Sequence, residues 1–130
     1  MDTQTPSMDR LGPGSHICCI HQTEEEHRKL VTDFVGTGLA QGQKVAYILD
    51  EHSEETIREY LAAVGLDVDS AVESGQLVLL TAADTYLSTG IFCPDRMLAF
   101  LREQVSLALD EGYSALRVTG EMTWATRGRP

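Results

Sequence analysis

The chain has 130 residues, 42% of them hydrophobic and 23% charged, a composition typical of one globular domain. Its 20 acidic and 10 basic residues give a formal net charge of −10, which argues against a nucleic-acid interface and against binding to an anionic membrane. No apolar run approaches the ~20 residues of a membrane span, and the polar N-terminus lacks the apolar segment of a signal peptide. The three cysteines do not suggest a disulfide framework, so we expect a reduced, cytoplasmic protein.

The first third of the chain predicts a leader, a strand and a helix. Residues 1–13 are expected to form a disordered leader, which a Gly-Pro-Gly turn separates from a strand over about 15–20. Thr23 and Glu26 have the spacing of a capping box, so a helix should start at Glu24 and end near Leu39. Apolar residues at helical spacing give this helix one buried face, namely Leu30, Val31, Phe34, Val35 and Leu39.

The middle of the chain predicts two buried strands joined by two helices. Residues 45–49 form a nearly continuous apolar run, as expected of a strand that is covered on both faces. Ser53 should cap a helix that ends near Val64, and a short helix over 67–74 should lead into a strand over 77–80. The helix after Ser53 is expected to bury Ile57, Tyr60, Leu61 and Val64.

The last third predicts a long loop, a helix and a final strand. The loop over 82–93 has no clear period, and loops of this length are often functional. Pro94 should open a helix that Gly112 ends, followed by a strand over 115–118. The apolar set expected for this helix is Met97, Leu98, Leu101, Val105, Leu107 and Leu109. Alternating strands and helices predict an α/β fold, a three-layer sandwich with a mainly parallel sheet over 14–126 and a short tail over 127–130.

The turn after the first strand lies where a nucleotide-binding α/β protein would place its phosphate loop. Such a loop needs glycines, a lysine and a Ser or Thr, whereas residues 16–26 contain no glycine and end in three successive glutamates, Glu24 to Glu26. Acidic residues in a first helical turn suit the helix dipole but repel a phosphate at that helix start. The pattern indicates a nucleotide-binding α/β layout with a degenerate phosphate loop, and favours a sensory role over ATP hydrolysis.

Several motifs together resemble the MEDS domain, a sensory domain of methanogen and methylotroph regulators of the dichloromethane-responsive type. They include Gly14-Ser15-His16-Ile17-Cys18, Gly75-Gln76-Leu77 and the segment from Gly90 to Met97. The most specific is Gly112-Tyr113 followed by Leu116-Arg117-Val118-Thr119-Gly120-Glu121-Met122-Thr123-Trp124. The resemblance covers about residues 12–125, and it implies a RecA/KaiC-like core without a phosphate loop.

The resemblance also implies a non-catalytic module of bacterial or archaeal signal transduction. Its partner would be a kinase, an anti-sigma-type protein or a DNA-binding effector, and its signal a small molecule or a signalling protein. Family domains usually continue past the tryptophan motif, so a C-terminally shortened domain or a piece of a longer protein is expected. Homodimerisation through a sheet edge or through the region of Trp124 is a further expectation.

The candidate ligand site lies at the carboxyl edge of the sheet, where open α/β sheets bind their ligands. Glu121 follows the last predicted strand, and His21 follows the first, so the two could hold a proton, a water or a polar ligand, or form a structural ion pair. Trp124 could line an apolar pocket, and Tyr86 and Phe92 in the long loop could cover it. Each of these aromatic residues could instead be a core, interface or loop-anchoring residue with no role in ligand binding.

Two further chemistries are weaker expectations. Cys18, Cys19 and Cys93 could serve as a thiol or metal-based redox sensor. Strand alternation, however, sends Cys18 and Cys19 to opposite faces of the strand. Both are equally explained as small buried hydrophobic residues. No metal ion or cofactor is expected, and a degenerate nucleotide-binding module is a further alternative. Asp50-Glu51-His52 follows the second strand at the same edge, but without a nucleophile motif it predicts no enzyme.

Overall fold

The computed structural model describes residues 23–85, 87, 90–91 and 93–121, and in these the chain forms four helices and one sheet. The elements alternate along the sequence, as predicted. In chain order they are α1 (Glu24–Ala40), β1 (Lys44–Leu49), α2 (Glu54–Ala63), α3 (Val68–Ser74), β2 (Leu77–Thr81), α4 (Pro94–Asp110) and β3 (Leu116–Gly120).

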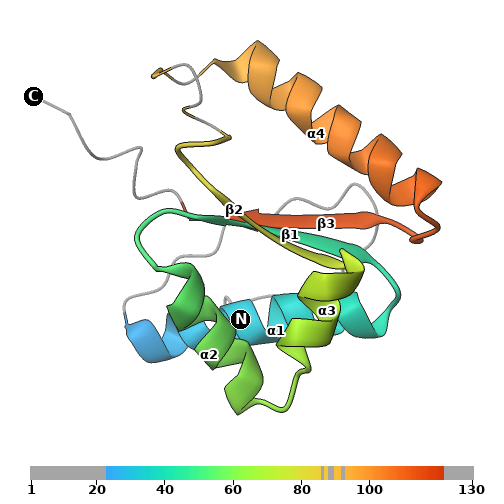
Figure 1. Cartoon of the computed structure of the whole chain (residues 1–130). Helices are drawn as coiled ribbons and strands as arrows, with labels where there is room; N and C mark the ends of the chain where they lie inside the picture. The colour runs from blue at the N-terminus through green and yellow to red at the C-terminus, as the bar shows by residue number, and fades with distance from the viewer. Residues whose placement is uncertain (1–22, 86, 88–89, 92, 122–130) are drawn as a thin grey trace, which may run out of the picture.

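The three described strands are parallel and have the order β2-β1-β3. Val45 of β1 pairs with Leu77 of β2 and with Arg117 of β3. All six residues of β1 are buried, as expected of a central parallel strand. In Figure 1, α1, α2 and α3 cover one face of the sheet and α4 covers the other, which gives the predicted three layers.

Local signals set the helix starts. The side chain of Thr23 accepts a hydrogen bond from the backbone of Glu26, whose carboxylate accepts from the backbone of Thr23, which completes the predicted capping box. Ser53 and Asp67 cap α2 and α3 in the same manner through one side-chain oxygen each. Gly75 ends α3 with a φ of 84°, a conformation that glycine adopts without steric cost.

The main hydrophobic core lies between the sheet and the layer of α1, α2 and α3. Val45, Tyr47 and Leu49 alternate along β1 and point their side chains into this core. From the faces that the sequence predicts, α1 and α2 contribute the buried residues Val31, Val35, Ile57 and Leu61, and α3 adds Val68 and Ala71. Tyr47 is the largest side chain in the core, and its phenol brings a hydroxyl to the carboxyl edge of the sheet.

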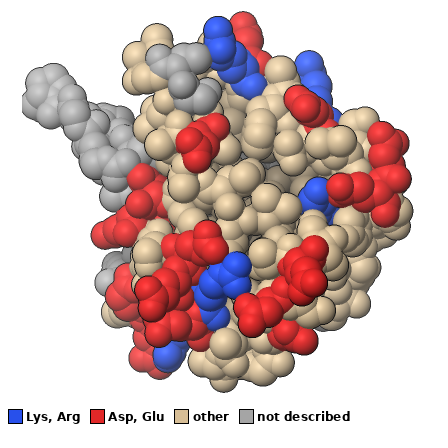
Figure 2. Space-filling view, viewed as in Figure 1, with Lys and Arg blue, Asp and Glu red and all other residues tan. Residues whose placement is uncertain are grey.

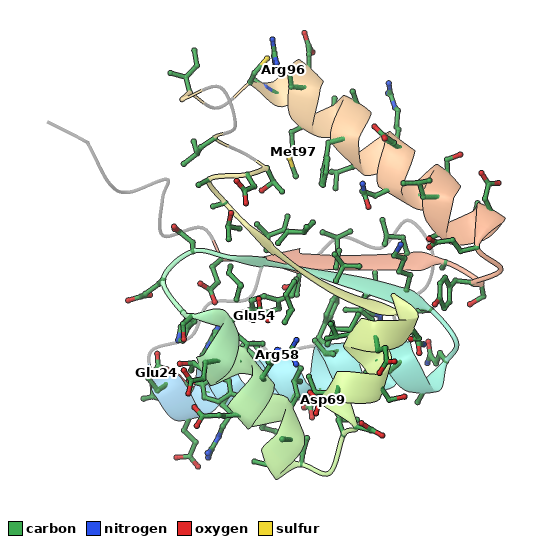
Figure 3. The ribbon with its side chains drawn as sticks, viewed as in Figure 1. Glu24, Glu54, Arg58, Asp69, Arg96 and Met97 are labelled. Carbon is green, nitrogen blue, oxygen red and sulfur yellow. The ribbon has the colours of Figure 1, made fainter. Side chains whose placement is uncertain are left out.

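Two predictions of burial are wrong. In α4, Leu98, Val105, Leu107 and Leu109 are 42–53% exposed, and Ala108 is the helix residue that is buried. Met97, in contrast, points from α4 toward the sheet (Figure 3). Helical spacing identified the apolar residues, but the helix meets the sheet along a different stripe. Val64 is also 58% exposed, because it is the C-cap of α2 and lies past the last buried turn.

Some predictions concern residues outside the described part of the chain. These are the leader over 1–13, the strand over 15–20, the degenerate phosphate loop before Thr23 and the tail over 127–130. The likeness to a RecA/KaiC core stays a prediction. Among the described residues, none of the helices has the length and apolar character that a membrane crossing requires.

Candidate functional site

A buried carboxylate organises the carboxyl edge of the sheet. Glu121 follows β3 directly and is 8% exposed. Its Oε2 accepts a hydrogen bond of 2.7 Å from the hydroxyl of Tyr47, and its Oε1 accepts one of 2.9 Å from each of the backbone amides of Asp50 and His52. A buried carboxylate requires such donors in place of water. Glu121 therefore joins the end of β3 to the middle of β1 and to the loop that connects β1 with α2.

His52 lies between two carboxylates. Its Nδ1 is 3.0 Å from Oε2 of Glu121, and its Nε2 is 3.0 Å from both carboxylate oxygens of Glu24, the first residue of α1. Burial by itself would lower the pKa of His52, but the hydrogen bond to Glu24 and the negative charge of Glu121 outweigh it and raise that pKa above its usual value. The imidazolium form is thus favoured at this position.

A second histidine packs against the first. His27, one helical turn after Glu24, is 6% exposed, and its ring stacks on that of His52 with centroids 4.2 Å apart and an interplanar angle of 16°. Nε2 of His27 lies 3.4 Å from the hydroxyl of Tyr47 and 4.0 Å from Oε2 of Glu121. Both imidazoles therefore approach the same buried carboxylate.

Tyr60 of α2 completes the cluster on its outer side. Its hydroxyl donates a hydrogen bond of 2.7 Å to Oε2 of Glu24, which raises the pKa of Tyr60 to about 12. The same hydrogen bond, together with that from His52, lowers the pKa of Glu24. The Tyr47 phenol is raised in pKa more strongly, chiefly because it is buried. Figure 3 shows Glu24 at the start of α1, on the side of the molecule where α2 begins.

A hollow of about 270 Å³ opens beside this cluster, between the carboxyl ends of β1 and β2 and the start of α2. Its lining is partly apolar and partly polar, and comprises Leu49, Asp50, His52, Ser53, Glu54, Thr81, Ala82 and Ala83. Glu54 is already engaged, because Arg58 donates to it over 2.9 Å and also reaches Asp69 of α3 over 3.1 Å (Figure 3). The start of α2 is thereby fixed against α3.

The structure places two of the predicted site residues. Glu121 lies at the carboxyl edge, as expected, and its described partners are Tyr47, Asp50 and His52. Cys93 is half-buried at the start of α4. The other predicted site residues lie outside the described part of the chain; they are His21, Cys18, Cys19, Tyr86, Phe92 and Trp124. The expected pairing of His21 with Glu121 therefore stays a prediction.

The sequence reasoning missed most of the cluster around Glu121. It placed His52 at the correct edge, immediately after β1, but assigned it no partner. It treated Glu24 as part of a solvated helix start, whereas the structure adds bonds from His52 and Tyr60 to that carboxylate. His27 was detectable only as a polar residue on the buried side of α1, one turn from Glu24 and one turn before Val31.

The comparisons with known proteins agree with the resemblance seen in the motifs. The family model described as MEDS, the methanogen/methylotroph DcmR sensory domain, matches residues 15–130. No curated protein and no solved structure gives a match. Because the family model covers nearly the whole chain, the protein belongs to the MEDS family of sensory domains.

Proposed function

We propose that this MEDS domain is a non-catalytic sensor that receives a small organic ligand in the hollow at the carboxyl edge of the sheet. The observation that carries the proposal is that residues lining the hollow are hydrogen-bonded to Glu121, at the end of β3. Glu121 holds the amides of Asp50 and His52, and both of these residues line the hollow. The carboxyl edge of an open α/β sheet is also the usual place for a ligand.

The network provides a physical route from ligand to output. A ligand in the hollow contacts the loop between β1 and α2, whose backbone position depends on Glu121. Any displacement of this loop changes the hydrogen bonds of Glu121 and therefore the end of β3, from which the chain continues to Trp124. A sensor needs a structural element whose conformation is affected both by the ligand and by the output partner. Trp124, Tyr86 and Phe92 remain our candidates for additional ligand contacts.

The size and lining of the hollow restrict the ligand. A volume of about 270 Å³ suits a molecule smaller than a typical drug. The apolar contribution of Leu49, Ala82 and Ala83 favours a compact molecule with an apolar part and one or two polar groups. The acidic start of α1 disfavours a phosphate-bearing ligand next to it. The cysteine content still favours a reduced, cytoplasmic setting. The effector that this domain regulates would be a kinase, an anti-sigma-type protein or a DNA-binding protein.

The test is a ligand screen by thermal shift on the full chain in the presence of EDTA, followed by amide NMR of each hit. We expect hits to shift the amides of residues 49–54 and 81–83 together with that of Glu121. A Glu121→Gln variant should weaken the response of β3 more than that of the hollow, and Glu73→Gln, an exposed residue on α3, is the control. Hits that map to the outer face of α4, or a response only to an added signalling protein, would refute the proposed site.

A further inference from the structure

Three potential metal ligands converge beside the hollow, and one of them, His52, also lines it. Glu24 and His27 come from the first turn of α1, and His52 comes from the loop between β1 and α2. One ligand atom from each residue lies within 4.8 Å of the other two. One carboxylate and two imidazoles are a common ligand set for divalent transition metals such as Zn²⁺.

The distances already approach those of a coordinated ion. Two ligands bound at about 2.0–2.1 Å to a tetrahedral metal lie roughly 3.3 Å from each other. Nε2 of His52 is 3.0 Å from the carboxylate oxygens of Glu24, so a metal ion could replace the shared proton with little movement of either group. The ring of His27 stacks on that of His52 at 4.2 Å with an interplanar angle of 16°, so it must turn its in-plane lone pair toward the ion to supply the third bond.

The second, independent observation concerns the groups behind the ligands. Metal-binding histidines usually direct their other ring nitrogen to a carboxylate, which orients the ring and fixes its tautomer. Nδ1 of His52 lies 3.0 Å from the buried carboxylate of Glu121. Likewise, the hydroxyl of Tyr60 donates to Glu24 over 2.7 Å and holds that carboxylate in place. Two of the three ligands thus have the outer partners typical of metal sites.

The surroundings attract cations and leave a path for entry. The side chain of Glu24 is 68% exposed, whereas that of His52 is 10% exposed, so an ion would arrive from solvent at the carboxylate side. Acidic side chains gather on the part of the surface where α2 and the start of α1 lie (Figure 2). They include Glu25, Glu26, Glu54 and Glu55 in the first turns of these helices. Together with the net charge of −10, they raise the local concentration of divalent cations.

We propose that Glu24, His27 and His52 bind one divalent transition-metal ion, with Zn²⁺ as the representative, and that Glu121 and Tyr60 orient the ligands. A fourth coordination position stays open to water. The site does not depend on the hollow holding an organic ligand.

The experiment is a calorimetric titration of the EDTA-treated, buffer-exchanged full chain with Zn²⁺, with Co²⁺ absorption as a second readout. We expect one ion per chain and an affinity that falls at least 100-fold in His27→Asn and in His52→Asn. Glu121→Gln should reduce the affinity about 10- to 100-fold, because it removes an outer partner only. Glu73→Gln, which removes the same charge from an exposed position on α3, is the control and should leave the affinity unchanged.

Other side chains of this sequence could bind Zn²⁺, so the experiment includes a Cys18→Ser, Cys19→Ser, Cys93→Ser triple variant. Unchanged binding by this variant supports the proposal. Loss of binding in the triple variant, wild-type affinity in both histidine variants, or no binding at all would overturn it. Circular dichroism of each variant shows whether it folds, and the Co²⁺ spectrum distinguishes nitrogen and oxygen ligands from thiolates. The ligand screen in EDTA gives its answer independently of this outcome.

Discussion

Replacing Tyr47 by Phe removes one hydroxyl from the buried centre of the site. This hydroxyl donates to Glu121 over 2.7 Å, Tyr47 is 1% exposed and Glu121 is 8% exposed, so water cannot take its place. A hydrogen bond to a charged acceptor contributes about 1.5–3 kcal/mol, and we expect the free energy of unfolding to fall by about 2 kcal/mol. For a chain of this length, that loss corresponds to a decrease in Tm of about 7 °C.

The matched control is Tyr60→Phe. Its hydroxyl donates to Glu24 over the same distance, 2.7 Å, but the Glu24 side chain is 68% exposed and water replaces the lost donor. Urea unfolding followed by circular dichroism, in EDTA, should therefore show a much smaller loss for Tyr60→Phe than for Tyr47→Phe. Equal losses in the two variants would refute the argument that burial gives the Glu121 network its strength.

Three further predictions concern packing, an ion pair and pH. Gly38→Ala should lower the free energy of unfolding by about 1–3 kcal/mol, because the new Cβ would lie 2.8 Å from a buried β1 side chain. Gly36→Ala should instead raise the free energy of unfolding by up to about 1 kcal/mol, because its Cβ would lie 3.6 Å from the nearest side-chain atom. Equal urea midpoints for the two variants would contradict this. Glu111→Ala should destabilise the chain more than Lys44→Met, because it leaves the buried ammonium of Lys44 without the Glu111 carboxylate that lies 2.6 Å away. A larger loss of unfolding free energy for Lys44→Met would contradict this. The raised pKa of His52 means that its stabilising charge is present below about pH 6.5 and is lost as the pH rises above that value, through the folded pKa. Unfolding in EDTA should therefore show a loss of stability above about pH 6.5 that His52→Asn abolishes, and a wild-type curve parallel to that of the variant would contradict this.

The fold was predictable where the signals are local. The capping box of Thr23 and Glu26 and the cap at Ser53 are each determined within four residues, and the structure confirms both. The stripe on which α4 meets the sheet depends instead on the position of β3. The sequence pattern therefore could not distinguish the exposed Leu98 and Leu109 from residues that face the sheet.

The site was less predictable because its members come from α1, β1, α2, the end of β3 and the loop after β1. Glu121 could be placed at the carboxyl edge, since it follows a buried strand directly. Tyr47 lies within the apolar run over 45–49, and only the pairing of β1 with β3 shows that its hydroxyl reaches Glu121. The stacking of His27 on His52 depends on how α1 lies beside the loop after β1, which periodicity does not describe.

The strand order has a consequence for the sequence of events in folding. Contacts between the start of β1 and the start of β2 close a chain segment of 33 residues, as between Gln43 and Gln76, whereas Tyr47 and Glu121 are 74 residues apart. Longer loops cost more entropy to close and delay the contacts that they bring together. We therefore expect β1, α2, α3 and β2 to form a first cooperative unit, and β3 to dock last. Until it docks, the amides of Asp50 and His52 lack their acceptor, so hydrogen exchange at these two amides reports directly on whether the domain has completed its sheet.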